Sequence, residues 1–199
     1  MNWIKRLFVS GSAGNEHLTA VTAAALLLLL AIEGATVLRI QSLLTVHAFV
    51  GMLLIPVLAV KVASTGWRFL RYYRRGEEYV RRGPPHLVLR ALVAPVIVLS
   101  TLVVFATGVA LLALGQTHGT IVGLHKASFI VWFGATSVHV LAHAPRLPRL
   151  LRSRIPGTAT RVALVTGALA AGAVLATATL PAADHLQERA SAQVRLDGR

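Results

Sequence analysis

Five long apolar runs dominate this sequence and limit the folds that it can adopt. They cover residues 18–38, 43–66, 87–114, 121–142 and 162–180. A helix of about 20 mainly apolar residues crosses the hydrocarbon core of a bilayer, so each run is long enough to span it. Because only helices and closed barrels satisfy their backbone hydrogen bonds in lipid, runs of this length predict helices. The sequence therefore predicts an all-α integral membrane protein with five transmembrane helices.

The composition agrees with a membrane protein and narrows its chemistry. Of the 199 residues, 55% are hydrophobic and only 14% are charged, which is too little charge to cover the surface of a soluble domain of this size. The chain contains no cysteine. This excludes disulfides, iron–sulfur clusters, thiolate ligands and the covalent attachment of a c-type haem.

The basic residues predict the orientation of the chain. Its net charge of +13 is concentrated in two of the segments between the runs, which hold Arg68, Arg71, Arg74, Arg75, Arg81 and Arg82, and Arg146, Arg149, Arg152, Arg154 and Arg161. The other two connecting segments hold only Arg39. Since cytoplasmic loops are enriched in Lys and Arg, we expect a multi-pass protein of the inner (cytoplasmic) membrane. Its N-terminus would be cytoplasmic and its tail from Pro181 would lie outside. The charge then needs no nucleic-acid partner.

Histidines inside the apolar runs are the main functional signal. Five of the eight histidines lie in or at the edges of the runs: His17, His47, His125, His139 and His143. Polar side chains in lipid are costly and usually face the interior of a bundle, although a single helix histidine more often packs than binds metal. His125 and His139 are 14 residues apart, which is nearly four helical turns and about 21 Å of rise on one face. This spacing suits two haems stacked across a membrane, each taking one axial imidazole from this helix.

The depths of the histidines predict how they pair. The second and fourth runs are parallel, and His47 and His125 both lie near their outer ends. His17 opens the first run and His139 lies near the end of the fourth, so both belong to the cytoplasmic side. We therefore predict two bis-His b-type haems, with His47 and His125 on the outer iron and His17 and His139 on the inner iron. His143, one turn after His139, is the alternative inner ligand.

This arrangement resembles the cytochrome b subunits of membrane-bound nickel–iron hydrogenase and formate dehydrogenase, and their bacterial di-haem cytochrome b relatives. In that family, a four-helix bundle takes one ligand from its first helix, one from its second and two from its fourth, which match the four positions given above. The resemblance implies a four-helix cytochrome b-like domain over residues 1–155, followed by a fifth transmembrane helix and an extracytoplasmic tail over 156–199. Ferric-reductase-like and bc-complex cytochromes carry paired histidines on each of two helices. Here Lys61 stands 14 residues after His47, which disfavours that pattern.

Four charged residues in or beside the runs have two interpretations each. Lys61 either extends to the cytoplasmic interface or pairs with a haem propionate. Lys126 and Arg39 either hold outer-haem propionates or anchor the helices at the interface. For Glu33, we expect a salt bridge with Arg39, and the alternative is a proton acceptor in quinol chemistry.

These residues predict a membrane b-type cytochrome that transfers electrons between the quinone pool and a redox partner subunit. Two haem b groups are the expected cofactors, and a quinone is a further candidate ligand. The chain would be the electron-transfer subunit of an oxidoreductase, since no hydrolytic or transferase motif is present. The alternatives are a non-redox small membrane transporter or structural subunit, and a self-contained haem reductase of an external acceptor.

Overall fold

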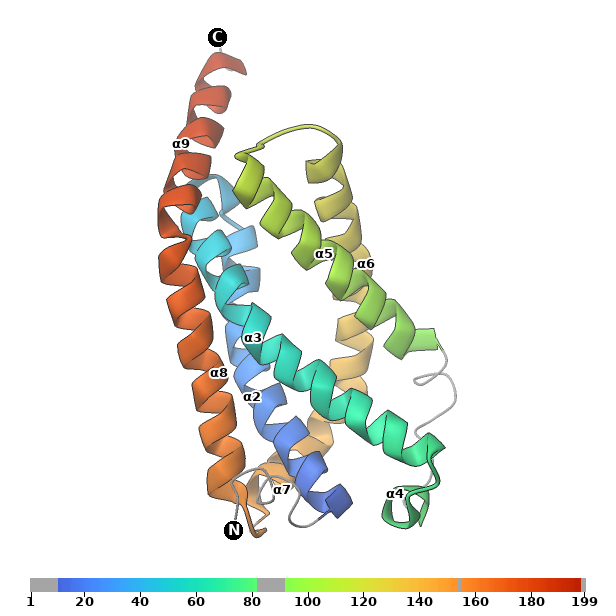
Figure 1. The fold of residues 1–199 in the computed structure, drawn as a ribbon. Coiled ribbons are helices and arrows are strands. Elements are labelled where there is room, and N and C mark those ends of the chain that lie inside the picture. Colours follow the sequence, from blue (N-terminus) through green and yellow to red (C-terminus); the bar gives the residue numbers. More distant parts are fainter. Residues whose placement is uncertain (1–10, 82–91, 154, 198–199) are drawn as a thin grey trace.

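The computed structural model describes residues 11–81, 92–153 and 155–197, and nearly all of them are helical (Figure 1). The long helices are α2 (Gly11–Val37), α3 (Ile40–Tyr73), α5 (Ala94–Leu114), α6 (Thr120–His143), α8 (Thr158–Ala178) and α9 (Leu180–Asp197); the short ones are α4 (Glu77–Arg81), η2 (Ala144–Arg146) and α7 (Leu147–Arg152). Within the described ranges, five helices are long and apolar enough to cross a membrane: α2, α3, α5, α8, and α6 with its short continuation to Arg152. The predicted all-α membrane fold with five spans is therefore confirmed.

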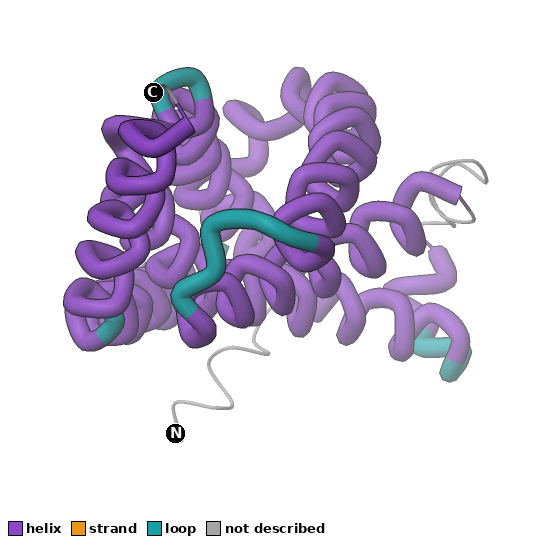
Figure 2. Tube along the Cα trace, turned by 90° about the horizontal axis from the view of Figure 1, so that it is seen from above, coloured by secondary structure: helices purple, strands orange, loops and turns teal. Residues whose placement is uncertain are grey.

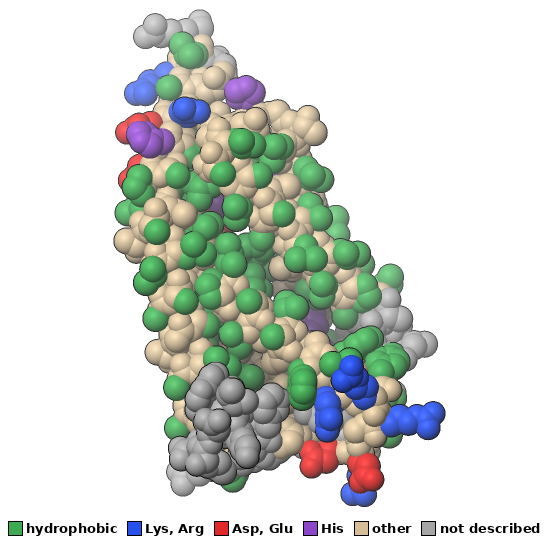
Figure 3. All heavy atoms as spheres, viewed as in Figure 1, with side chains coloured by type: hydrophobic (Ala, Val, Ile, Leu, Met, Phe, Trp, Pro, Cys, Tyr) green, Lys and Arg blue, Asp and Glu red, His purple; other side chains and the backbone are tan. Residues whose placement is uncertain are grey.

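The bundle has two chemically different ends. At one end lie α4 and α7 with their arginines, and at the other lie α9 and the connections 38–39 and 115–119 (Figure 1). We call these the arginine-rich end and the α9 end. On the face shown in Figure 3, charged side chains gather at the two ends, and many hydrophobic side chains lie between them. Such a belt suits the hydrocarbon core of a bilayer, so the chain is a multi-pass protein in a lipid environment.

The helix ends follow local sequence rules that the apolar runs alone do not show. α3 is 34 residues long and continues past the predicted limit of residue 66 to Tyr73, because its arginines are good helix formers whose charged ends reach water. α5 carries a proline in its first turn, where a missing N–H does no harm. It ends at Gly115, whose left-handed backbone (φ 62°) is typical of a helix C-terminus.

The spans form two groups rather than one evenly packed bundle. α2, α3 and α8 pack together around Leu26, Leu54, Val57 and Ala168. α5 and α6 form a hairpin that packs mainly on itself, and the two groups meet where α5 contacts α3 and where α7, the continuation of α6, contacts α2. Seen from above, the chain is almost entirely helix joined by short loops (Figure 2). The space-filling view is hollowed between α3 and α5, and histidine atoms are visible in the hollows at two levels (Figure 3).

Small residues let α8 approach α3 closely. Ala168 and Gly172 are buried, whereas Gly167 and Ala171, the other pair at the same spacing, are exposed. A Cβ added at Gly172 would lie 2.3 Å from the carbonyl oxygen of Leu53, so α8 rests against the backbone of α3 at this point. Of the two small-residue pairs, only one therefore serves helix packing.

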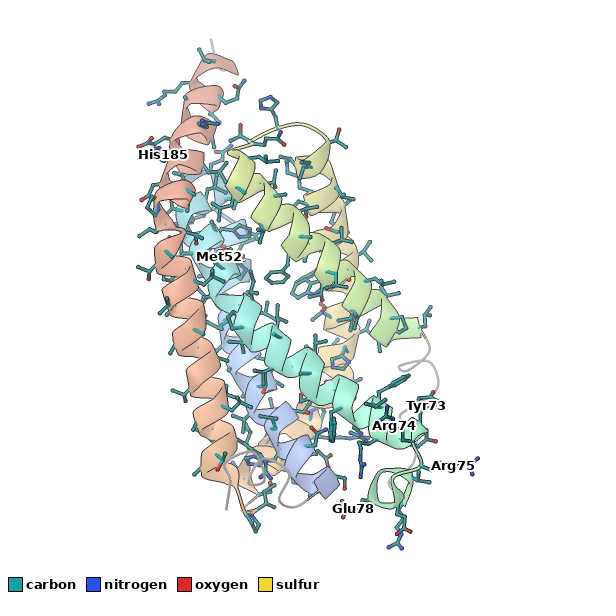
Figure 4. The ribbon with its side chains drawn as sticks, viewed as in Figure 1. Met52, Tyr73, Arg74, Arg75, Glu78 and His185 are labelled. Carbon is teal, nitrogen blue, oxygen red and sulfur yellow. The ribbon has the colours of Figure 1, made fainter. Side chains whose placement is uncertain are left out.

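The polar tail after residue 180 is a helix, which the apolar pattern did not predict. α9 follows α8 after a break at Thr179, and Pro181 lies in its first turn. It buries Ala183 and Leu186 against Met52 of α3, which is labelled in Figure 4, and against Leu112 of α5. α9 therefore touches both helix groups at one end of the bundle.

Candidate functional site

The rings of His47 in α3 and His125 in α6 lie face to edge across the space between the two helix groups. Their centroids are 6.3 Å apart and their planes make an angle of 86°. The two helices make no extensive backbone contact with each other. The two imidazoles therefore come together because their side chains extend into the space between the helices.

Hydrogen bonds assign the tautomer of His47. Its Nδ1 lies 2.9 Å from the Oε1 atom of Glu33 and 3.1 Å from the hydroxyl of Thr36. The carboxylate can only accept, and the Thr36 hydroxyl already donates to the carbonyl of Glu33 at 2.6 Å. Nδ1 therefore carries a proton, and in the neutral imidazole the lone pair of His47 lies on Nε2.

The same reasoning assigns His125. Its Nδ1 lies 3.0 Å from the carbonyl oxygen of Val104 and 3.0 Å from the hydroxyl of Thr107, both in α5. The Thr107 hydroxyl donates to the carbonyl of Val103 at 2.6 Å, so both neighbours of the ring accept. Nδ1 of His125 is thus the donor, and Nε2 again carries the lone pair. Neither Nε2 atom has a hydrogen bond within the described segments.

Glu33 has a different partner from the one that the sequence predicts. We expected a salt bridge with Arg39, but its carboxylate contacts His47, and both side chains are largely buried (14% and 21% exposed). A sequence signal for this contact exists, because Glu33 and His47 lie seven residues on either side of residue 40, at the tight turn between α2 and α3. Residues equally distant from such a turn face each other across the hairpin.

Three glycines lie near these histidines in the structure or in the sequence. A Cβ at Gly108 of α5 would lie 3.2 Å from Cε1 of His125, so the ring rests directly on this glycine. A Cβ at Gly51 would be in ordinary contact, 3.7 Å from Glu33. Gly134, which lies between His125 and His139 in the sequence, has open space around it. Gly108 lies on a different helix from both histidines, so spacing along the sequence does not reveal its contact with His125.

His17, the predicted ligand of the first helix, lies deep inside the protein. It is 3% exposed, and its Nδ1 has no hydrogen-bond partner within the described residues. Its electrostatic neighbour is Arg161 of α8, a fully buried guanidinium that donates to the carbonyl of Pro156 at 3.0 Å. Neither a hydrogen bond nor a ring contact joins His17 to His139 within the described ranges.

The two histidines at the end of α6 lie against each other. The rings of His139 and His143 stack with centroids 4.4 Å apart and an angle of 24°. Nδ1 of His143 donates to the carbonyl of His139 at 2.9 Å. Nδ1 of His143 is therefore already engaged by its own helix, whereas His139 faces charged Lys61 through space.

The predicted basic anchors differ in their surroundings. The ammonium of Lys61 donates to the carbonyl of Thr19 at 3.1 Å and so joins α3 to α2. Asn15 reinforces this junction by donating to the carbonyl of Ser64. Arg39 and Lys126 are exposed near the α9 end, and in the described part of the chain no side-chain hydrogen bond or ion pair holds either of them.

Within the described residues, no three His, Cys, Asp or Glu side chains gather in a group that could hold a metal ion alone. A cofactor that brings its own equatorial ligands needs only two protein ligands, and His47 and His125 form such a pair. Comparison of the chain with protein-family models, with curated proteins and with solved structures gave no match. The geometry of the histidines is therefore the observation from which we infer the function.

Proposed function

We propose that this protein is a membrane b-type cytochrome that holds a haem between His47 and His125 and transfers electrons between the quinone pool and a redox partner. The observation that carries the proposal is the pair of facing imidazoles, each with Nδ1 hydrogen-bonded and Nε2 available. Iron in a haem alternates between the ferric and ferrous states and thereby carries single electrons. The protein supplies the ligands, their orientation and the surrounding charge.

The ring separation supports bis-His ligation. A metal–imidazole bond is about 2 Å long, and a ring nitrogen lies about 1.1 Å from the centre of its five-membered ring. Two imidazoles on opposite sides of one iron therefore have centroids about 6 Å apart, close to the 6.3 Å found here. Edge-to-face packing of two rings gives centroid separations of about 4.5–7 Å as well, so the distinction between ligation and packing rests on the hydrogen bonds at Nδ1.

The hydrogen bonds at Nδ1 support the same interpretation. Histidines that bind metal almost always donate their other ring N–H to a carboxylate or a backbone carbonyl, which fixes the tautomer and the ring orientation. His47 donates to the carboxylate of Glu33, and His125 donates to the carbonyl of Val104. Exposed Arg39 and Lys126 at the same end are suited to pair with the propionates of this outer haem.

We also propose a second haem on His17 and His139, nearer the arginine-rich end. In its support, His17 is buried with an unpartnered ring nitrogen, a situation that costs about 1–3 kcal/mol when nothing binds that atom. His139 is preferred to His143, whose Nδ1 donates within its own helix. Lys61 then acts as a nearby positive charge that is held in place by Thr19.

The proposed orientation follows from the arginines. Both arginine-rich segments lie at one end of the bundle, so we place this end and the N-terminus in the cytoplasm, and the α9 end outside the inner membrane. The haem of His47 and His125 is then the outer one, and a redox partner subunit would meet it at the α9 end. A quinone would exchange electrons with the haems from within the membrane.

Pyridine haemochrome analysis of the purified protein tests the proposal. We expect two b haems per chain, both low-spin because two imidazoles are strong ligands. His47→Ala and His125→Ala should each remove the same haem, and His139→Ala should leave that haem in place. His118→Ala, which changes an exposed histidine in a loop, is the matched control and should bind haem like the wild type.

Each other result would favour a different interpretation. Protein without a Soret band would favour a non-redox transporter or structural subunit, with the histidines as packing groups. A high-spin spectrum would indicate an open coordination position and hence a reductase of an external acceptor. If His17→Ala keeps both haems while His143→Ala removes one, the inner haem has His143 as its ligand.

A further inference from the structure

Gln187, in the helix that follows the last span, is hydrogen-bonded to the start of the helix that carries His47. Its side-chain oxygen accepts from the backbone N–H of Leu44 at 2.8 Å and from that of Thr45 at 3.4 Å. Its side-chain nitrogen donates to the carbonyl of Gln41 at 2.6 Å. One amide side chain of α9 thus serves three backbone groups in the first turns of α3.

These three groups lie at a break in the helix. Leu43 has non-helical backbone angles (φ −117°, ψ 21°), so α3 bends there. In an uninterrupted helix, the N–H of Thr45 would bond to the carbonyl of Gln41. Gln187 stands between these two groups and satisfies both, which stabilises the break in one geometry. His47 is two residues after Thr45, so its backbone direction depends on this bend.

α9 also holds the hairpin that carries His125. The guanidinium of Arg189 donates to the carbonyl of Gly115, at the end of α5, at 3.2 Å. Leu186 of α9 packs in the same cluster as Leu112 of α5 and Met52 of α3. The two helix groups touch directly where α3 meets α5 and, at the arginine-rich end, where α2 meets α7, so α9 is a further connection between them at the α9 end, where His47 and His125 lie.

We infer that α9 is a clamp that positions His47 and His125 relative to each other, with Gln187 as its main positioning residue. The inference rests on the proposed haem between these histidines. The amide of Gln187 fixes the bend before His47, and Arg189 fixes the loop that precedes the helix of His125. Neither residue touches the two imidazoles, so the effect must pass through the backbone.

The test compares Gln187→Leu with Gln187→Glu and with Gln116→Leu in the full-length protein. Leucine removes both hydrogen-bonding functions, whereas glutamate keeps the oxygen that accepts from Leu44 and Thr45. Gln116 is exposed in the loop at the same end, and no side-chain hydrogen bond engages it within the described segments, so Gln116→Leu is the matched control. The readouts are the rate of haem transfer to apomyoglobin and the electron paramagnetic resonance spectrum, which reports the angle between axial imidazole planes.

We expect Gln187→Leu to release the outer haem about tenfold faster than the wild type, as is usual when support of a metal ligand is removed. Its spectrum should show a shifted and broadened outer-haem signal. Gln187→Glu keeps the acceptor for Leu44 and Thr45 but sets an oxygen against the carbonyl of Gln41, so it should lie between the wild type and Gln187→Leu in both properties, and Gln116→Leu should match the wild type. A wild-type rate and spectrum for Gln187→Leu would overturn the clamp while leaving the haem proposal intact.

Two further outcomes of this experiment can be distinguished from those above. If the wild type contains no haem, the proposed function itself fails and the clamp fails with it. If Gln187→Leu does not accumulate in membranes, Arg189→Met decides, because it removes only the link to Gly115. Faster haem release and a shifted outer-haem signal in Arg189→Met would support the clamp, and wild-type behaviour would overturn it.

Discussion

The Oε1 atom of Glu33 lies 2.9 Å from Nδ1 of His47, and the two residues come from neighbouring helices joined by a tight turn. The second carboxylate oxygen of Glu33 is buried and has no hydrogen-bond partner within the described residues. The carboxylate is therefore directed mainly at one imidazole. This contact gives the outer site an asymmetry, since the acceptor opposite, at His125, is a neutral carbonyl.

Replacing Glu33 with Gln should raise the midpoint potential of the haem proposed between His47 and His125. A carboxylate that accepts from an axial imidazole makes that ligand more basic and stabilises ferric iron, so the neutral amide should favour the ferrous state. We expect a rise of about 60 mV, which corresponds to about a tenfold change for one electron. Redox titration followed in the visible spectrum measures it. Glu188→Gln, in an exposed pair with His185, is the control (Figure 4). An equal shift in both variants would contradict the prediction.

Adding one methyl group at Gly108 should disturb the outer site. The new Cβ would approach Cε1 of His125 to 3.2 Å, so the ring must move away from Val104 and Thr107. We expect Gly108→Ala to lower outer-haem occupancy several-fold, measured by the pyridine haemochrome. Gly167→Ala meets open space in α8 and should retain full occupancy. Normal occupancy in Gly108→Ala would mean that the ring has room to shift.

The contact between α8 and α3 should be sensitive to side-chain size at Gly172. A Cβ there would lie 2.3 Å from the carbonyl oxygen of Leu53, which is backbone and cannot turn aside. We expect Gly172→Ala to destabilise the protein by about 1–3 kcal/mol, the usual range for overpacking. Gly167→Ala, five residues away on the exposed face, should be neutral or slightly stabilising. Thermal unfolding in detergent distinguishes the two, and equal midpoints would show that α8 does not pack on α3 through Gly172.

The proposed topology can be tested with reporter fusions. Alkaline phosphatase is active only outside the cytoplasm. Green fluorescent protein fluoresces when it remains in the cytoplasm but not when it is exported through the Sec pathway. Fusions after Glu78 of α4 should fluoresce, and fusions at the C-terminus, beyond α9, should show phosphatase activity. The reason is the concentration of arginine at the α4 end of the bundle. Signals on the same side would show that one of the five helices does not span.

The sequence was sufficient to predict the five spans, because each is a predominantly apolar run whose length matches the thickness of a bilayer. The sequence also predicted that His47 and His125 lie at a common level, because two parallel helices whose first residues are known place equivalent positions at equal depth. It could not predict the partner of Glu33, because Arg39 is nearer in the sequence and the contact depends on how the hairpin closes. The sequence did not predict α9, for a different reason. Its residues are polar overall, and only Ala183 and Leu186 reveal a buried face.

The partial separation of the α5–α6 hairpin from the other spans has a consequence for biosynthesis. α2 and α3 leave the ribosome before α5 and α6, and with them His47 and the carboxylate that orients it. The second half of the site arrives with α6, after a further hairpin has entered the membrane. α9 is made after all five spans, and its side chains contact the turn after α2 and the loop after α5. A chain truncated before residue 180 would thus contain every proposed ligand but would lack the segment that holds the two halves of the site together.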